Sequence, residues 1–415
     1  MAGTVLHLVK DFSPPSQTFI YDLIVLLNKN PSDSFHSHIV GYYRKRLLAE
    51  ERKYPGIISL AKRRDFLGRL SNFIRFGGNA KREIVNNLNK SIERLNPQII
   101  HAHFAWTVWD LLIPYSQIHR LEIPVLISVH GTDILKTARQ SSAKRLSLIH
   151  FSENFKTSFT VASDFMSKEL INIGISKEKI YKVPNSISTN FISKNKKPAI
   201  ERSSNNGTTY HIACVGRLVN WKGQRYLIEA VSYLIRKSKI RCKLTLIGDG
   251  PERKSLEKLV KELSIEDAVC FEGFVSHAKI PEILHRQDIY VQPSIYDKET
   301  GQCEAFGVSI LEAISCGLPI IASRSGGIPD VIGKESEFAR LIKPADSKEL
   351  YLMLLEAYQS KVFTKDNSAY ARERLNTFSQ QKQVDKINSI YLTTKIAKGL
   401  KRQSHNQHRT LNAEH

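Results

Sequence analysis

The chain has 415 residues, 41% hydrophobic and 24% charged, a balance that excludes a disordered chain and indicates two globular domains of about 150 to 200 residues each. No apolar run reaches the roughly 18 residues of a membrane span, and the five cysteines form no CxxC pair, which argues against a zinc site or a disulfide framework. The formal net charge of +21 indicates an anionic partner.

Strands and helices alternate along the first half of the chain. Short apolar runs predict buried strands, and apolar residues at helical spacing predict helices. The expected strands are 4–9, 36–41, 97–103, 124–129, 159–162 and 180–183, and the expected helices are 17–27, 57–76, 80–95 and 163–173. This alternation predicts a parallel sheet covered by helices.

Basic residues are concentrated in one part of this half. Residues 40–82 hold twelve Lys or Arg against three acids. The helix expected over 57–76 has an apolar stripe flanked by four arginines, Arg63, Arg64, Arg69 and Arg75. Such a helix is typical of an anionic membrane surface, and the alternative is a solvated helix that packs its stripe on the core. Because Lys10 follows the first apolar run instead of preceding it, no signal peptide is expected and the cytoplasmic side of the membrane is favoured.

Two histidine motifs follow predicted strands. His101 and His103 form an HxH pair on one side of a strand, but no third ligand stands near them in the sequence, so no metal site is expected. The strand 124–129 delivers His130-Gly131-Thr132-Asp133 at its carboxyl end, where open parallel sheets bind ligands. His130 is therefore a candidate functional residue.

A second series of strands and helices begins after a polar segment. Residues 195–207 predict a linker between a domain over 1–194 and a domain over 208–378. The expected elements of the second domain are strands at 210–215, 243–247, 269–271, 288–291 and 320–323 and helices at 223–236, 256–263 and 306–315. A final helix over 379–397 is expected to cross back to the first domain, before a basic, disordered tail over 398–415. The predicted fold class is α/β, with two doubly wound Rossmann-like domains.

Charged residues gather where the strands of the second domain end. Arg217 and Lys222 follow the strand 210–215, and a guanidinium fork and an ammonium together suit a diphosphate. Glu304 precedes the helix expected from Phe306. The start of that helix would offer an anion its unpaired backbone amides, at Ala305, Phe306, Gly307 and Val308.

Glu312 lies inside the same helix among apolar neighbours. An unpaired carboxylate there would cost several kilocalories per mole, so Glu312 needs a partner or a ligand. Two plainer roles remain open, namely an ion pair for Glu312 and a solvated loop position for Glu304.

These motifs resemble the donor site of a known family. The two glutamates eight positions apart, followed by CGLPIIASRSGGIPDVI, are similar to the signature of the retaining, two-domain nucleotide-sugar glycosyltransferases of family 4. The resemblance implies the GT-B architecture, with the two domains facing across a cleft. It implies catalytic roles for His130 and Glu304, diphosphate contacts from Arg217, Lys222 and Ala305 to Val308, a ribose contact from Glu312, and a base-side position for Phe274 and Val275.

The loop DFSPPSQTF resembles a subset of the family that extends bacterial exopolysaccharides, of the colanic-acid and amylovoran type. This implies transfer of a hexose from a nucleotide diphosphate sugar to a lipid-linked glycan acceptor, with retention of configuration, at an anionic membrane surface. The acceptor-side candidates are Phe12, Ser13, Thr18 and His103.

Other motifs are missing from the sequence. It contains no GxGxxG, no GxxxxGK and no Asp-x-Asp pair, so neither a cofactor nor a metal ion is expected, and no nucleic-acid-binding module is found. Two alternatives remain open. One is a nucleotide-sugar hydrolase or epimerase of the same architecture, and the other is a non-catalytic, basic, membrane-binding adaptor.

Overall fold

The computed structural model describes residues 3–11, 18–29, 35–43, 57–60, 79–188, 191 and 209–394. The chain divides into two compact units. The first unit takes Met1–Val161, Ser167–Val183 and the residues from Gln380 onward, and the second takes Ala162–Met166 and Pro184–Ser379. A helix over 380–394, which follows all elements of the second unit, therefore belongs to the first.

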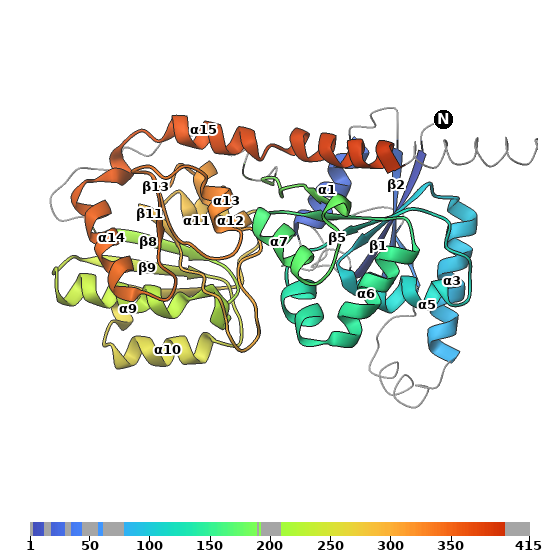
Figure 1. Cartoon of the computed structure of the whole chain (residues 1–415). Helices are drawn as coiled ribbons and strands as arrows, with labels where there is room; N and C mark the ends of the chain where they lie inside the picture. The colour runs from blue at the N-terminus through green and yellow to red at the C-terminus, as the bar shows by residue number, and fades with distance from the viewer. Residues whose placement is uncertain are drawn as a thin grey trace, which may run out of the picture. The chain divides into compact units, whose positions relative to one another are not determined.

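The first unit contains a seven-stranded sheet in the order β3-β2-β1-β4-β5-β6-β7, and every pair in it is parallel. Figure 1 labels β1, β2 and β5 of this sheet. Its strands are β1 Gly3–Asp11, β2 Phe35–Tyr43, β3 Ile58–Ser59, β4 Ile99–His103, β5 Val125–Ser128, β6 Thr157–Val161 and β7 Ile180–Lys182. The strand order reverses between β1 and β4. Ligands of open α/β sheets bind at such a switch point, outside the carboxyl ends of the strands.

Helices cover this sheet. They are α1 Thr18–Lys29, α3 Asn79–Leu95, α4 Ala105–Thr107, α5 Ile113–Ser116, α6 Ser142–Asn154, the part of α7 Asp164–Asn172 from Ser167 onward, and the helix over 380–394. Leu23 of α1 and Ile387 of the last helix share one apolar cluster with Val5 and Ile99 of the sheet. The helix over 380–394 thus completes the core to which the first strand contributes.

One predicted helix begins differently in the structure. Ile58–Ser59 is a strand that pairs with β2, and Leu60 N donates to Gly41 O at 3.0 Å, so the helix expected from Ile57 is wrong at its start. The apolar residues there extend the edge of the sheet instead. The rest of the predicted basic helix, the linker 195–207 and the tail 398–415 lie outside the described residues.

The second unit contains a six-stranded, fully parallel sheet in the order β10-β9-β8-β11-β12-β13. Its strands are β8 Tyr210–Val215, β9 Cys242–Ile247, β10 Val269–Gly273, β11 Ile289–Gln292, β12 Ile320–Ser323 and β13 Ala339–Ile342. The order reverses between β8 and β11, which places a second switch point there. Two doubly wound α/β units confirm the predicted fold class.

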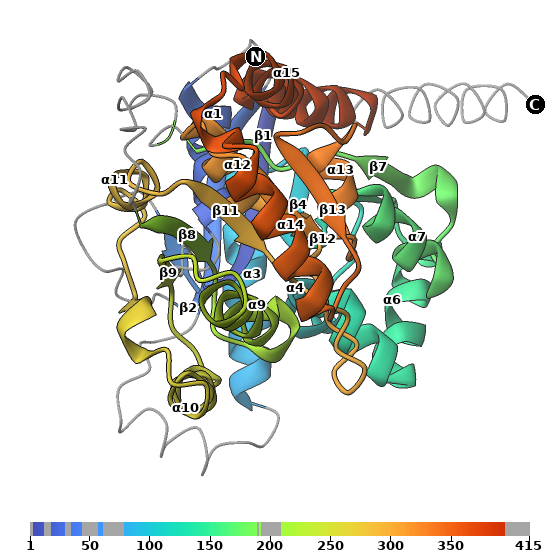
Figure 2. The same ribbon diagram turned by 90° about the vertical axis from the view of Figure 1, so that its left-hand side faces the viewer.

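Successive side chains of these strands enter two different cores. Ile212 lies in a cluster with α9 Gln224–Arg236, α10 Arg253–Glu262 and α14 Ser347–Gln359, and α9 and α14 lie side by side (Figure 2). Ala213, the next residue, lies in the opposite cluster. That cluster includes residues of α11 Ile280–Leu284, α12 Val308–Ser315 and α13 Ile328–Ile332, packed against α15 Ser368–Thr377. The sheet therefore lies between two helical layers.

Candidate active site

The predicted cations of the second unit lie at its switch point. Arg217 and Lys222 follow β8, and Pro293 follows β11, the neighbouring strand. Gly223 has φ 71°, and a Cβ there would lie 1.9 Å from the carbonyl oxygen of Pro293. Only glycine allows this approach, so Gly223 brings the loop after β8 against the loop after β11.

Glu304 is buried and paired rather than solvated. Lys222 Nζ donates to Glu304 Oε2 at 2.5 Å, and Ser294 Oγ lies 3.3 Å from the same oxygen. The two charged side chains are only 12% and 11% exposed. Removing one partner of such a pair would leave an uncompensated charge with little access to water. The sequence motif therefore folds into a neutralised pair.

Two glycines hold the Glu304 loop from behind. Gly327 N donates to Glu304 O at 2.8 Å. Gly326 has φ 55°, and a Cβ on it would lie 1.9 Å from that same carbonyl oxygen. Ser163 Oγ also donates to Ala305 O at 2.7 Å. The two glycines at positions 326 and 327 therefore support the backbone of the Glu304 loop.

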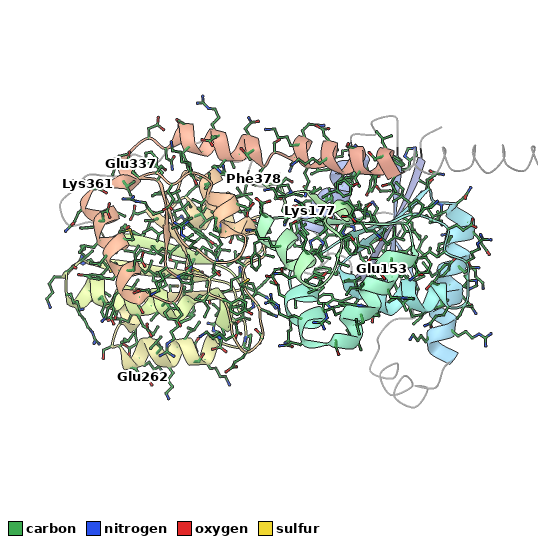
Figure 3. All side chains as sticks on the ribbon, viewed as in Figure 1. Glu153, Lys177, Glu262, Glu337, Lys361 and Phe378 are labelled. Atoms are coloured by element: carbon green, nitrogen blue, oxygen red, sulfur yellow. The ribbon has the colours of Figure 1, made fainter. Side chains whose placement is uncertain are left out.

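The helix that carries Glu312 begins later than expected. α12 starts at Val308, and Gly307 is its N-cap residue with φ 108°. Ala305 and Phe306 lie in the turn before it, so their amides do not belong to the helix start. Phe306 is a core residue whose ring lies edge-on, at 5.4 Å, to that of Phe378, and Phe378 is labelled in Figure 3. The apolar side chain of Phe306 fits the helical spacing of the sequence, which is why the helix was predicted to begin there, but its backbone is not helical.

Glu312 has a partner that the sequence analysis did not identify. His277 Nε2 lies 2.8 Å from Glu312 Oε1, and the side chains are 11% and 7% exposed. The ring of Phe191 contacts the His277 ring at 5.2 Å and 60°. The plainer role expected for Glu312, a partner in an ion pair, is therefore realised with His277 whenever that ring is protonated. The sequence signal that could have identified His277 is its position four residues after β10, where the chain leaves the carboxyl edge of the sheet.

The remaining candidates of this unit are exposed or half-buried. Arg217 is exposed, and its guanidinium makes no hydrogen bond or ion pair with other residues that the structure describes. Phe274 is 58% exposed, while Val275 packs partly against the core. An aromatic face and a cation thus stay accessible at the same edge as Glu304 and Glu312.

The HGTD motif of the first unit is organised by its aspartate. Asp133 is fully buried and accepts hydrogen bonds from the backbone amides of Ala105, His130 and Gly131 at 2.9, 3.2 and 3.1 Å. Burial raises the pKa of Asp133 to about 6, although these three bonds oppose that shift. Asp133 therefore fixes the turn that follows β5 and, with it, the position of His130.

His130 lies among aromatic side chains. Its ring is 4.8 Å from the ring of Phe19 and 4.6 Å from that of Phe104. Its Nε2 is buried without a hydrogen-bond partner among the described residues. Burial, helped by His103, lowers the pKa of His130 well below 6.5. The neutral ring therefore presents a nitrogen that the rest of the described fold does not use.

His103 belongs to a buried histidine network. His7, on the neighbouring strand β1, places Nδ1 3.0 Å from His103 Nε2, whereas His103 Nδ1 has no partner in the described part of the chain. The two nitrogens of His101 lie 2.6 Å from the Tyr391 hydroxyl and 2.7 Å from Ser128 Oγ. His7 supplies the third histidine that the sequence spacing did not show.

One ring nitrogen from each of His7, His101 and His103 lies within 4.8 Å of the others. Three neutral imidazoles so close together could hold a metal ion. Five of their six ring nitrogens, all but His103 Nδ1, however already bond to one another or to hydroxyl groups, and no carboxylate is part of the group. We therefore describe the cluster as a hydrogen-bond network.

The other acceptor-side candidates are placed only in part. Phe12 and Ser13 lie outside the described residues, and Thr18 is the half-buried first residue of α1. None of the helices that the structure describes is both long and apolar enough to cross a membrane.

Two sequence-family models match the chain. Residues 18–191 match the model described as Glycosyltransferase Family 4, and residues 195–374 match the model described as Glycosyl transferases group 1. Between them the two models cover most of both units.

Individual relatives carry glycosyltransferase and synthase names. The chain is 26% identical over 313 residues to N-acetyl-alpha-D-glucosaminyl L-malate synthase of Bacillus anthracis. This alignment covers 74% of this chain and 78% of that protein. It is 32% identical over 197 residues to MMP alpha-(1->4)-mannosyltransferase of Mycolicibacterium hassiacum, which covers 47% of this chain and 43% of that protein. The second alignment thus spans less than half of its relative.

Solved structures share the fold. HepE of Anabaena, in complex with UDP and glucose, superposes with a TM-score of 0.68 at 20% identity, over 94% of this chain and 99% of that chain. At this identity the likeness shows the architecture alone. The two family models, which match residues 18–191 and 195–374, show that the chain belongs to the group 1 and family 4 glycosyltransferases, and the solved structure shows their two-domain GT-B fold.

Proposed function

We propose that the protein transfers a hexose from a nucleotide diphosphate sugar to a lipid-linked oligosaccharide, with retention of configuration, in bacterial surface polysaccharide assembly. The observation that carries the donor part is the pairing of Lys222 with Glu304 at the switch point of the second sheet. HepE, a structural neighbour, was crystallised with UDP and glucose, which makes UDP-glucose the first donor to test.

The leaving diphosphate would bind between Arg217, Lys222 and the start of α12. Arg217 is exposed and offers a rigid fork, Lys222 adds a point charge, and the amides from Val308 onward add the positive end of the helix dipole. These groups stabilise the negative charge that develops as the bond to the sugar breaks. We therefore propose a reaction that needs no metal ion.

Glu304 would contact the transferred sugar, and Glu312 would accept hydrogen bonds from the ribose hydroxyls. Both carboxylates are held by basic partners, so each is oriented before the donor arrives. Phe274 and Val275 would lie on the side of the base. In the first unit, His130 and His103 would serve the sugar or acceptor, because each presents a buried nitrogen that no described residue uses.

The test is product analysis with a panel of UDP-, GDP- and ADP-hexoses, with and without a lipid-diphosphate-linked glycan. We expect a glycolipid product only when the acceptor is present, the same anomeric configuration in donor and product by NMR, and full activity in excess EDTA. Free sugar released without acceptor would point to a hydrolase, and an altered nucleotide sugar would point to an epimerase. If no donor is turned over, the protein would instead be a non-catalytic membrane-binding adaptor. Loss of activity in EDTA, restored by manganese, would refute metal independence.

The acceptor of this reaction resides in a membrane, so the enzyme would bind peripherally to the cytoplasmic face. Residues 40–82 carry the charge surplus that supports this, although most of them lie outside the described residues. The proposal rests on their composition, because cationic residues near an anionic surface add binding energy that salt weakens.

A further inference from the structure

We propose that His277 is a positioning residue that fixes the Glu312 carboxylate for the nucleoside's ribose. The inference rests on the proposed function, in which Glu312 receives the ribose hydroxyls. It starts from one contact, the 2.8 Å approach of His277 Nε2 to Glu312 Oε1 in the second unit.

The direction of this hydrogen bond follows from the chemistry of the two groups. An ionised carboxylate only accepts hydrogen bonds, so His277 Nε2 carries the proton and donates it. In the described part of the chain, Glu312 Oε1 receives this one bond and Oε2 receives none. One oxygen is thus held by the protein, and the second is left for a ligand.

His277 is itself held in place. Its ring lies edge-on to Phe191 at 5.2 Å and 60°, and its side chain is 11% exposed. Phe191 is 1% exposed and belongs to the core beneath α12. The donor atom therefore sits on a packed ring rather than on a mobile surface side chain.

A fixed carboxylate discriminates better than a free one. Glutamate has three rotatable side-chain bonds, and a ligand that binds a loose glutamate must also order them. Two adjacent ribose hydroxyls need acceptor oxygens at one defined angle. His277 sets that angle by anchoring Oε1, so its loss would weaken binding of ribose hydroxyls specifically, by about tenfold, the usual worth of a charge-assisted hydrogen bond.

A purely structural ion pair makes a different prediction. In that case His277 would only balance the buried charge of Glu312, and its loss would lower stability without changing which nucleotide binds. The two roles are separated by a ligand that lacks the hydroxyls.

The experiment measures the affinities of the full chain for UDP and for 2′,3′-dideoxy-UDP by calorimetry. His277→Phe keeps the ring on Phe191 and removes the donor, whereas His277→Gln keeps a donor. His211→Phe, at the amino end of β8, is the matched control. Each variant's melting temperature is recorded, so a loss of folding is seen separately from a loss of selectivity.

We expect the parent and His211→Phe to bind UDP much more tightly than 2′,3′-dideoxy-UDP. Glu312→Gln should lose this difference in affinity, and in His277→Phe the ratio of the two affinities should fall about tenfold. His277→Gln should recover part of the loss, and Glu312→Gln combined with His277→Phe should lose no more than Glu312→Gln alone. In turnover assays His277→Phe should raise KM for the donor more than it lowers kcat, because ribose contacts persist in the transition state.

Two results would overturn the inference, and they are distinguishable. If Glu312→Gln loses the preference for UDP while His277→Phe keeps it in full, the proposed ribose contact stands and the role of His277 is refuted. If Glu312→Gln keeps the preference, the ribose contact itself fails and the inference fails with it.

Discussion

The Glu304 carboxylate is neutralised by Lys222 before any ligand arrives, which separates its role in binding from its role in the reaction. Glu304→Gln keeps the shape of the side chain and releases the charge of Lys222. We therefore expect the variant to bind UDP at least as tightly as the parent and to transfer no sugar.

Calorimetry and a transfer assay measure the two effects separately. The control is Glu335→Gln. Glu335 is an exposed carboxylate that is paired with Arg324, so the substitution makes the same chemical change outside the proposed site. Undiminished transfer by Glu304→Gln would remove Glu304 from the reaction.

At this scale the sequence predicted the residues but not their partners. The rule that ligands bind at the carboxyl ends of parallel strands located Arg217, Lys222 and Glu304 correctly at one edge of the second sheet. It could not show that Lys222 reaches Glu304, 82 positions away, or that His277 reaches Glu312, 35 positions away. Such pairings depend on side-chain direction and packing, which spacing along the chain does not contain.

At the scale of elements, regular strands were predictable where they are buried on both faces. β8 and β12 have the predicted bounds, because each is a short apolar run with a neighbouring strand on both sides in a parallel sheet. β13 at the sheet edge was missed, since only its two end residues are buried. The segment 105–116 was also missed, because a π-helical stretch, Val108–Leu112, shifts the side chains away from helical spacing before α5.

The histidines of β1, β4 and the turn after β5 make the first sheet sensitive to acid. Burial lowers the pKa of His7, His101 and His130 well below 6.5 and that of His103 to about 3. These rings are neutral in the folded state, whereas the unfolded chain protonates them near 6.5. Their stabilisation is therefore complete above pH 6.5 and is lost progressively as the pH falls below 6.5, by up to about 1.4 kcal/mol per pH unit for each ring.

Asp133 acts in the opposite direction over part of this range. Burial raises its pKa from 3.8 to about 6, so its protonated folded form gains stability as the pH falls from 6 to 3.8. Four rings outweigh one carboxyl group, and we expect the urea midpoint to fall steadily below pH 6.5. His103→Gln should flatten this profile, whereas His150→Gln, on the surface of α6, should leave it unchanged. Equal slopes for the two variants would contradict the explanation.

A polar contact inside an apolar cluster links the helix over 380–394 to the first sheet. Tyr391 is 1% exposed, and its hydroxyl lies 2.6 Å from His101 Nδ1. Tyr391→Phe leaves that nitrogen without its partner and should lower the free energy of unfolding of the first unit by about 1 to 3 kcal/mol. Tyr181→Phe, at a 37% exposed position of the same unit, should change it by less than about 0.5 kcal/mol. Urea denaturation compares the two, and equal effects would show that the contact contributes nothing.

At the scale of the whole molecule, the charge surplus is the main feature that the site does not explain. We expect the protein to float with liposomes that contain acidic lipid, to float poorly with neutral liposomes, and to dissociate as salt rises, because each cation near the surface contributes about 1 kcal/mol that salt screens. Replacing Arg63, Arg64, Arg69 and Arg75 together by Ser should reduce flotation strongly.

The matched control replaces four exposed lysines of the second unit by Ser, namely Lys254, Lys258, Lys261 and Lys348. It removes the same charge from α10 and α14, so the comparison separates a defined surface from net charge alone. Flotation of the arginine variant at the parent's level would show that residues 40–82 do not bind the membrane.

The order of the chain has a consequence for biosynthesis. The first unit needs Tyr391, which is 290 positions after its partner His101, whereas the second unit is complete at Ser379. At about 5 to 20 residues per second, a ribosome would take roughly 15 to 60 seconds to make that stretch. The first sheet emerges early but acquires the helix over 380–394 only after the whole second unit has been made. Nascent chains arrested at a length that brings residue 379 just outside the exit tunnel, with the helix over 380–394 still inside it, should therefore resist protease in the second unit and be cleaved in the first.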